Sequence, residues 1–363
     1  MEIEKEVFSH FIQRGFAKNF AINGVVKYIK YPNGELSSFN LNDNNSEHPI
    51  AIKGFFSNDI ETGMNNLESN GIDIIKKIAQ TAQFCEEVSL NRKELITLKF
   101  YSLLSGFRTH KLRNNILNRT GDSLFNKIIN EAGDDPKNIQ QKMIKTILKY
   151  WDSNKNELTG DYLIDMNKYI NDKITQLCLV IISNTMNSRL LIFKFNSKNL
   201  LLTEALNFTE QNKKSGGILL DFMPIFSNIG IAFYFDPVIA RRSDVTSQKS
   251  EIFENDISNI IHINEYVNFE LMKRKQIEYL KYSQNIYKDS RIFWATEAKK
   301  YHHKNDKYIY KVLKESKNSA SICNAMALVQ CQDSYVIFQN KDDIKEAKRF
   351  IAEKGIYRAE DFQ

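Results

Sequence analysis

A small set of polar side chains, spread from the start of the chain to its middle, has the chemistry of hydrolysis or of anion binding. The set is His10, Arg14, Glu61, Glu68, Arg108 and Glu204. A histidine can act as an acid, a base or a metal ligand near neutral pH. An arginine binds phosphate or carboxylate through a planar fork of donors. If these side chains meet in one cleft, His10 and Glu204 would hold a divalent metal ion, Mg²⁺ or Mn²⁺, and the arginines would neutralise an anionic substrate.

The same residues also have a purely structural interpretation. In the opening stretch "HFIQRGFAKNF", from His10 to Phe20, the phenylalanines would pack in a core while the polar side chains face solvent. Glu61 and Glu68 are seven residues apart, so on one helix they share a face and lie about 10 Å from each other. They would form either a solvated acidic face or an ion pair with a buried Arg108. The sequence leaves both interpretations open.

The sequence lacks the common motifs of catalysis and metal binding. It has no Gly-x-x-x-x-Gly-Lys-Ser/Thr, no Gly-x-Gly-x-x-Gly after a strand, no Gly-x-Ser-x-Gly, no His-Glu-x-x-His and no paired Cys/His zinc spacing. The four cysteines include no Cys-x-x-Cys, which predicts reduced thiols in a cytoplasmic protein. The charged start "MEIEKEVFSH" is unlike a signal peptide. The longest apolar run, near residues 174–183, is shorter than the about 20 residues that span a bilayer, so no membrane association is expected.

Helical periodicity dominates the first half of the chain. Apolar residues recur at helical intervals between Ile60 and Ile78, where Gly71 would break or kink the helix. Ser89 is a candidate N-cap for the next helix. Further helices are expected near residues 122–131, 136–151 and 160–184, and Pro136 suits a first helical turn.

Short β-type segments occur near the start of the chain and again after residue 188. Residues 25–31 and 35–41 flank Pro32-Asn33-Gly34, a strong hairpin signal. The runs "RLLIFKFN", "NLLLTEALNF", "GGILLDFMPIF" and "IGIAFYFD" are apolar and bounded by turn residues. Near the end, "SYVIFQ" predicts a strand and "DDIKEAKRFIAEKG" a helix. The predicted class is α+β: a mainly helical body with an N-terminal β-hairpin and a small sheet after residue 188.

Several of these segments, in their order, resemble the bacterial family named domain of unknown function 4238, over roughly residues 8–290. The segments are "HFIQRGFAKNF", "DIETGMNNLESNG", "LKFYSLLSGFRTHKLR", "LLLTEALNF", "MPIFSNIGIAFYF" and "INEYVNFELMKRKQIEYLKYSQNIY". Gln13 departs from the family's proline, and Glu204 stands where the family has the aspartate of Ser-Asp-x-Pro. The resemblance implies a single α+β domain over residues 1–290 and an extension over 291–363. It implies no established activity.

The extension mixes aromatic and basic side chains in "RIFWATEAKKYHHKNDKYIYKVLK". Basic groups interleaved with aromatics can bind single-stranded nucleic acid by phosphate contacts and stacking. The residues predicted to do so are Lys299, Lys300, His302, His303 and Lys304. The alternative is an amphipathic helix with a solvated basic face.

Two functional hypotheses follow from these residues. The first is a metal-dependent hydrolase of nucleic acid or another phosphodiester, serving as an effector in antiphage defence or as a toxin. The second is a non-catalytic binding or sensor protein of a defence system, in which the same charges form a buried polar network. The formal net charge of +6 permits a nucleic-acid partner without requiring one.

Overall fold

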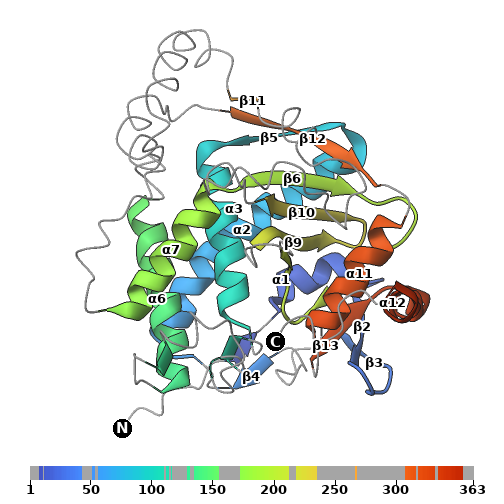
Figure 1. Cartoon of the computed structure of the whole chain (residues 1–363), viewed down its shortest axis with the longest axis horizontal. Coiled ribbons are helices and arrows are strands. Elements are labelled where there is room, and N and C mark those ends of the chain that lie inside the picture. The colour runs from blue at the N-terminus through green and yellow to red at the C-terminus, as the bar shows by residue number, and fades with distance from the viewer. Residues whose placement is uncertain are drawn as a thin grey trace.

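Helices on both sides and strands through the middle make up the described part of the molecule (Figure 1). The computed structural model describes residues 8–10, 12–42, 51–53, 56–109, 112–113, 116, 129–130, 135–154, 172–211, 218–234, 266–267, 307–315, 318–331 and 334–354. Within these ranges, no helix combines the length and the apolar character that crossing a membrane requires.

Four helices pack together at the left of Figure 1: α2 (Asn58–Phe84), α3 (Arg92–Phe107), α6 (Pro136–Asn154) and α7 (Lys173–Asn187). The short α1 (Arg14–Ala17) and the 3-10 turn η1 (Lys18–Phe20) precede them in sequence. Phe16 and Phe20 of this opening stretch are buried in the same core as the four helices. The Asn19 side chain donates a hydrogen bond of 3.0 Å to the carbonyl of Ile225, which joins the stretch to the main sheet.

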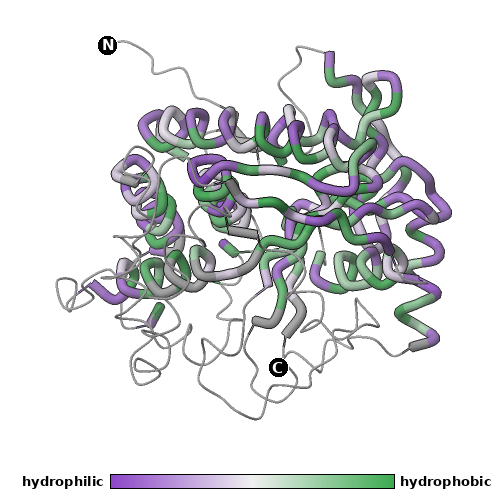
Figure 2. Tube along the Cα trace, turned by 90° about the horizontal axis from the view of Figure 1, so that it is seen from above, coloured by the Kyte–Doolittle hydropathy of each residue, from purple (hydrophilic) through white to green (hydrophobic). Residues whose placement is uncertain are grey.

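The main sheet has seven strands drawn from distant parts of the chain. Their order is β11 (Tyr266–Val267), β12 (Lys307–Lys314), β6 (Arg189–Lys194), β10 (Ile229–Tyr234), β9 (Ile218–Phe226) and β8 (Phe208–Gln211), and β5 (Glu87–Asn91) also pairs with β12. The β12–β6 pair is parallel and the others are antiparallel. The central strands carry long hydrophobic stretches, whereas the helices alternate between hydrophobic and hydrophilic residues (Figure 2).

A second sheet of four strands follows the order β3 (Ser37–Asn40), β2 (Val25–Lys30), β13 (Tyr335–Phe338) and β7 (Leu202–Thr203). The pairing of β2 with β3 confirms the predicted hairpin. Strand β1 (Phe8–His10) pairs with β4 (Ala51–Lys53) as a separate two-stranded sheet.

The predicted arrangement, a mainly helical body with an N-terminal hairpin and a small sheet after residue 188, is wrong. The main sheet is large and takes β5 from before that residue, and the hairpin belongs to a sheet completed by β7 and β13. Strands β12 and β13, which lie in the predicted extension, pair with strands from the earlier part of the chain. The domain boundary at residue 290 stays a prediction.

Two local predictions on the helices also fail. Ser89 lies in β5, and α3 is instead capped by Asn91, whose side chain accepts from the backbone N–H of Glu94 while the Glu94 carboxylate accepts from that of Asn91. Helix α2 does not break at Gly71, where the missing side chain lets the ring of Tyr101 pack closely: a Cβ there would lie 2.4 Å from the ring. Most of the predicted helix near 122–131 lies outside the described residues. Residues 160–171, the first part of the predicted helix near 160–184, also lie outside them.

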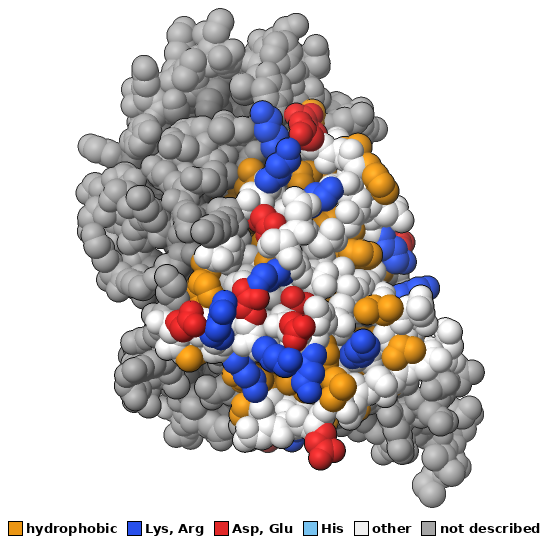
Figure 3. All heavy atoms as spheres, turned by 90° about the vertical axis from the view of Figure 1, so that its right-hand side faces the viewer, with side chains coloured by type: hydrophobic (Ala, Val, Ile, Leu, Met, Phe, Trp, Pro, Cys, Tyr) orange, Lys and Arg blue, Asp and Glu red, His pale blue; other side chains and the backbone are white. Residues whose placement is uncertain are grey.

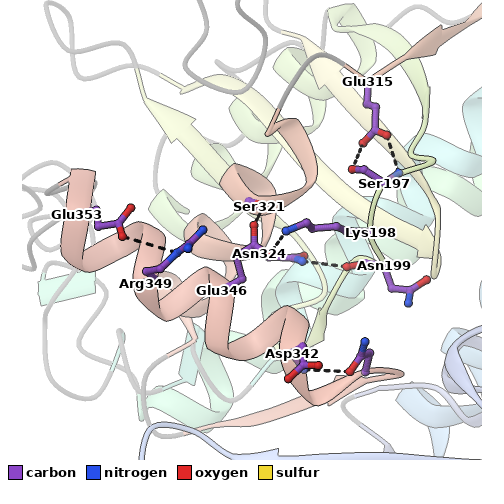
Figure 4. Close-up of polar contacts among 11 residues, drawn as sticks. Ser197, Lys198, Asn199, Glu315, Ser321, Asn324, Asp342, Glu346, Arg349 and Glu353 are labelled. Carbon is purple, nitrogen blue, oxygen red and sulfur yellow. Dashed lines mark hydrogen bonds and ion pairs between the residues drawn. The ribbon is translucent and has the colours of Figure 1, made fainter.

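The last two helices, α11 (Ser319–Gln330) and α12 (Lys341–Lys354), dock on the loop that follows β6 (Figure 4). The Glu315 carboxylate accepts hydrogen bonds from the backbone N–H groups of Asn196 (2.8 Å) and Ser197 (2.6 Å). The Asn324 amide donates to the carbonyl of Asn199 at 2.9 Å and accepts from the N–H of Leu201 at 2.8 Å. These contacts tie Glu315, just before α11, and Asn324 of α11 to the polar groups of the loop.

Gly71→Ala tests the close approach of α2 to α3. Because the new methyl group would overlap the Tyr101 ring in a filled core, we expect a loss of about 1–3 kcal/mol in the free energy of unfolding. Chemical denaturation followed by circular dichroism measures it.

Gly63→Ala on the same helix is the matched control. Its Cβ would meet only the mobile end of Leu148, at 2.9 Å, and alanine is favoured over glycine in a helix by about 1 kcal/mol. Equal stability of the two variants would contradict the proposed role of Gly71.

Candidate functional site

Arg108, immediately after the last turn of α3, is the largest of the fully buried side chains, with 1% of its surface exposed. Its Nη1 donates to Oε1 of Glu68 on α2. Burial lowers the pKa of Arg108 to about 10, against the opposing effect of the negative charge of Glu61. Arg108 is therefore a buried cation that faces carboxylates of α2.

Glu61 and Glu68 both lie on the buried face of α2, with 6% and 9% of their surface exposed. They alternate on this face with core residues such as Met64 and Leu67. The helix brings both carboxylates to the side that packs on α3. The solvated acidic face, one of the two interpretations left open by the sequence, does not form.

Two buried glutamines extend this group of polar residues. The Tyr101 hydroxyl, whose pKa is raised by burial, donates to Oε1 of Gln13 at 2.8 Å. The Gln140 amide, on α6, donates to the carbonyls of Phe107 (2.9 Å) and Thr109 (3.1 Å), on either side of Arg108. We call the set Gln13, Glu61, Glu68, Tyr101, Arg108 and Gln140 the polar cluster.

Several atoms of the polar cluster have unused hydrogen-bonding capacity. Among the described residues, Nε2 of Gln13, Oε1 of Glu61, Nε of Arg108 and Oε1 of Gln140 are buried without a hydrogen-bond partner. Such a group typically costs about 1–3 kcal/mol when left unpaired. The polar cluster therefore contains buried donors and acceptors whose hydrogen-bonding capacity is not satisfied within the described part of the protein.

The other predicted site residues lie elsewhere or outside the description. Arg14 is exposed on α1, and Glu204 is buried just after β7, with its backbone N–H donating to the carbonyl of Tyr335 at 3.0 Å. His10 lies in β1, but its side chain is not described. Of the predicted set, the structure thus brings together Glu61, Glu68 and Arg108.

Two predicted sites cannot be located in the structure. Within the described ranges, no three His, Cys, Asp or Glu side chains form a group that could hold a metal ion. Residues 299–304, the predicted nucleic-acid contacts Lys299, Lys300, His302, His303 and Lys304, lie outside those ranges.

Helix α6 carries a lysine-rich face that no sequence motif indicates. A shallow depression of about 310 Å³ is lined there by Asn138, Gln141, Lys142, Lys145, Thr146 and Lys149, which we call the α6 lysine face. Lys142 pairs with Asp172 at 2.9 Å and Lys145 with Asp59 at 3.1 Å, both on the rim. A hydrogen bond from Ser57, followed by the contact with Lys145, lowers the pKa of Asp59 to about 2. The helical spacing of these lysines is the sequence signal that could have revealed the face.

A second depression, of about 220 Å³, lies between α2 and the start of α3. Two of its charged side chains contact each other: Lys77 lies 2.7 Å from Glu94, and Glu94 also caps α3. The lining also includes the carboxylates of Asp73 and Glu94, which makes this depression less suited to an anion than the α6 lysine face.

Comparison with known proteins adds no assignment: no family model, no curated protein and no solved structure matches this chain. The resemblance to domain of unknown function 4238 stays a prediction.

Glu68→Gln tests the central ion pair. The variant leaves the Arg108 guanidinium buried without its partner carboxylate, so we expect a loss of about 3 kcal/mol in the free energy of unfolding. Urea denaturation measures it.

Asp73→Asn on the same helix is its control, because the exposed Asp73–Lys76 pair, 3.6 Å apart, should contribute less than about 0.5 kcal/mol. A Glu68→Gln variant no less stable than Asp73→Asn would argue against a structural role for the pair.

Proposed function

We propose that the protein is a nucleic-acid-binding protein that contacts the phosphate backbone through the α6 lysine face. The observation that carries this proposal is the composition of the depression: three lysines, two amides and one hydroxyl, with no acidic side chain among the described residues that line it. Lysine, Asn, Gln and Thr side chains are among the groups that contact phosphate and sugar in protein–nucleic acid complexes. Such contacts position a duplex or a single strand without reading its sequence.

The aspartates on the rim compete with phosphate only weakly. Lys142 and Lys145 are 41% and 55% exposed, and exposed ion pairs typically contribute 0 to about 1 kcal/mol. Phosphate contacts gain in addition from the release of counterions condensed on the nucleic acid. A nucleic-acid backbone can therefore displace Asp59 and Asp172 from the lysines at a small energetic cost.

The opposite side of the molecule offers a less suitable surface. Basic and acidic side chains are intermixed there (Figure 3). Lys198 pairs with Glu346, and Lys345 pairs with Asp342 at a distance of 2.9 Å. Phosphate groups on that side would meet carboxylates close to the lysines, which favours the α6 lysine face.

The surroundings of the polar cluster favour the binding proposal, because they are poorly suited to hydrolysis of a phosphodiester. Arg108 is enclosed and already paired with Glu68, so its guanidinium is not available to an anionic substrate. Hydrolysis remains the second candidate, because Oε1 of Glu61 has no hydrogen-bond partner and could accept a proton as a general base. The leading proposal assigns the polar cluster no catalytic role.

Binding is measured by the fluorescence anisotropy of labelled single-stranded RNA, single-stranded DNA and duplex DNA. We expect the combined Lys142→Gln, Lys145→Gln and Lys149→Gln variant to bind more weakly, since it loses three phosphate contacts. For duplex DNA, the slope of log K against log salt concentration should decrease by about 2.7. Asp59→Asn should bind more tightly, because it removes the negative charge that faces Lys145.

The control variant loses the same number of positive charges at other places, through the combined substitutions Lys314→Gln, Lys341→Gln and Lys345→Gln. These three lysines are exposed and lie outside α6. If the control weakens binding as much as the α6 variant, net charge rather than the α6 lysine face explains the affinity. Absence of any binding by the wild type would overturn the proposal.

Gel electrophoresis of the same oligonucleotides after incubation with Mg²⁺ or Mn²⁺ tests the second candidate. We expect intact nucleic acid with the wild type. Cleavage by the wild type that is lost in Glu61→Gln would instead support hydrolysis, whatever the anisotropy result.

A further inference from the structure

The lysines of the α6 lysine face form one row along the helix axis. Lys142, Lys145 and Lys149 are three and four residues apart, so they project from the same side of α6. Because an α-helix rises by 1.5 Å per residue, the row is about 10 Å long. Asn138, one turn before Lys142, continues it. The face is therefore a straight row of groups that can contact successive phosphates of one strand.

Two neighbouring helices border this row. Lys142 reaches Asp172, the N-cap of α7, and Lys145 reaches Asp59, the second residue of α2. Helix α6 packs against both of these helices. The row is the floor of a depression, whereas a helix that reads base edges enters the major groove. The face is therefore shaped to receive the convex phosphate backbone and does not reach the bases.

The depression offers no surface on which bases could stack. Proteins that bind single strands without sequence preference combine a basic groove with aromatic side chains that stack on the bases. None of the described residues that line the depression is aromatic. The aromatic residues of α6 are Tyr150 and Trp151, and both pack in the core, with Trp151 only 4% exposed. A single strand would therefore gain affinity from its phosphates alone.

Phosphate contacts by themselves favour a duplex over a single strand. Each neutralised phosphate contributes about 0.9 to the salt slope of log K for duplex DNA and about 0.7 for single strands. For three lysine contacts, the two slopes are about 2.7 and 2.1. Relative to 1 M salt, this difference favours the duplex about fourfold at 0.1 M salt.

We propose that the ligand of the α6 lysine face is double-helical nucleic acid, bound through the phosphates of one strand and without regard to base sequence. This inference rests on the proposed function of the same face. The three lysines supply the positive charges, and Asn138 and Gln141 supply hydrogen bonds to phosphate or sugar oxygens. Duplex DNA and duplex RNA share the phosphate chemistry and differ in the 2′-hydroxyl groups.

Fluorescence anisotropy of a labelled strand, alone and annealed to its complement, tests this inference with the full chain. The strand has no self-complementary segment, and the titrations are made in 0.1 M salt with both DNA and RNA. We expect at least one duplex to bind about fourfold more tightly than its own labelled strand. The comparison of the DNA and RNA duplexes identifies which one is preferred. Unlabelled duplexes of unrelated sequence should compete equally well.

The combined Lys142→Gln, Lys145→Gln and Lys149→Gln variant shows whether the preference comes from this face. We expect the variant to bind duplex and single strand weakly and with similar affinity. The control variant with Lys314→Gln, Lys341→Gln and Lys345→Gln should keep the preference of the wild type for the duplex.

The wild-type titrations decide the matter even if a variant fails to fold. Equal or tighter binding of the single strands would overturn the inference and leave nucleic-acid binding by the protein intact. A duplex sequence that competes more than about tenfold better than the others would show base readout, which also contradicts the inference. Absence of binding to every oligonucleotide would instead reject the proposed function itself.

Discussion

The ion pair between Arg108 and Glu68 is the constraint on which the packing of the helices depends. A buried guanidinium must keep a carboxylate partner, because removing one member of such a pair costs several kcal/mol. The pair therefore fixes where α3 ends against α2. About one turn along α2, Gly71 receives the ring of Tyr101, which lies two turns before Arg108 on α3. These two contacts hold the antiparallel helices in one register.

Local features of the fold could be predicted from the sequence, and long-range strand pairing could not. The hairpin of β2 and β3, the start of α6 at Pro136 and the helix α12 follow from signals within a few residues of each other. The membership of β5 and β13 in the two sheets depends on partners far away in the chain. In "EVSLN" the strand is only five residues long and runs directly into α3, so Ser89 resembles a helix N-cap although it lies in the strand.

The candidate site likewise combines features that the sequence predicts with features that depend on packing. The spacing of Glu61 and Glu68 established that they share a helix face, but only packing decides whether that face meets solvent or α3. Gln13 and Gln140 carry no motif, since glutamine is common on surfaces, and their roles follow from burial and from their specific partners. The α6 lysine face is visible as a helical repeat. The depression that makes this face a candidate binding site depends on the folded shape of the protein, which the spacing of the lysines does not predict.

The two faces of α6 connect the surface with the polar cluster. Its outer face carries Lys145, which pairs with Asp59, and Asp59 precedes Glu61 by two residues on α2. Its inner face carries Gln140, which holds the carbonyls on either side of Arg108. A phosphate that draws Lys145 away from Asp59 therefore acts on the same turn of α2 that supplies Glu61. Because an exposed pair contributes at most about 1 kcal/mol, the coupling through this contact would change affinity by no more than about fivefold. A larger effect of nucleic acid on the polar cluster would require a movement of α6 as a whole.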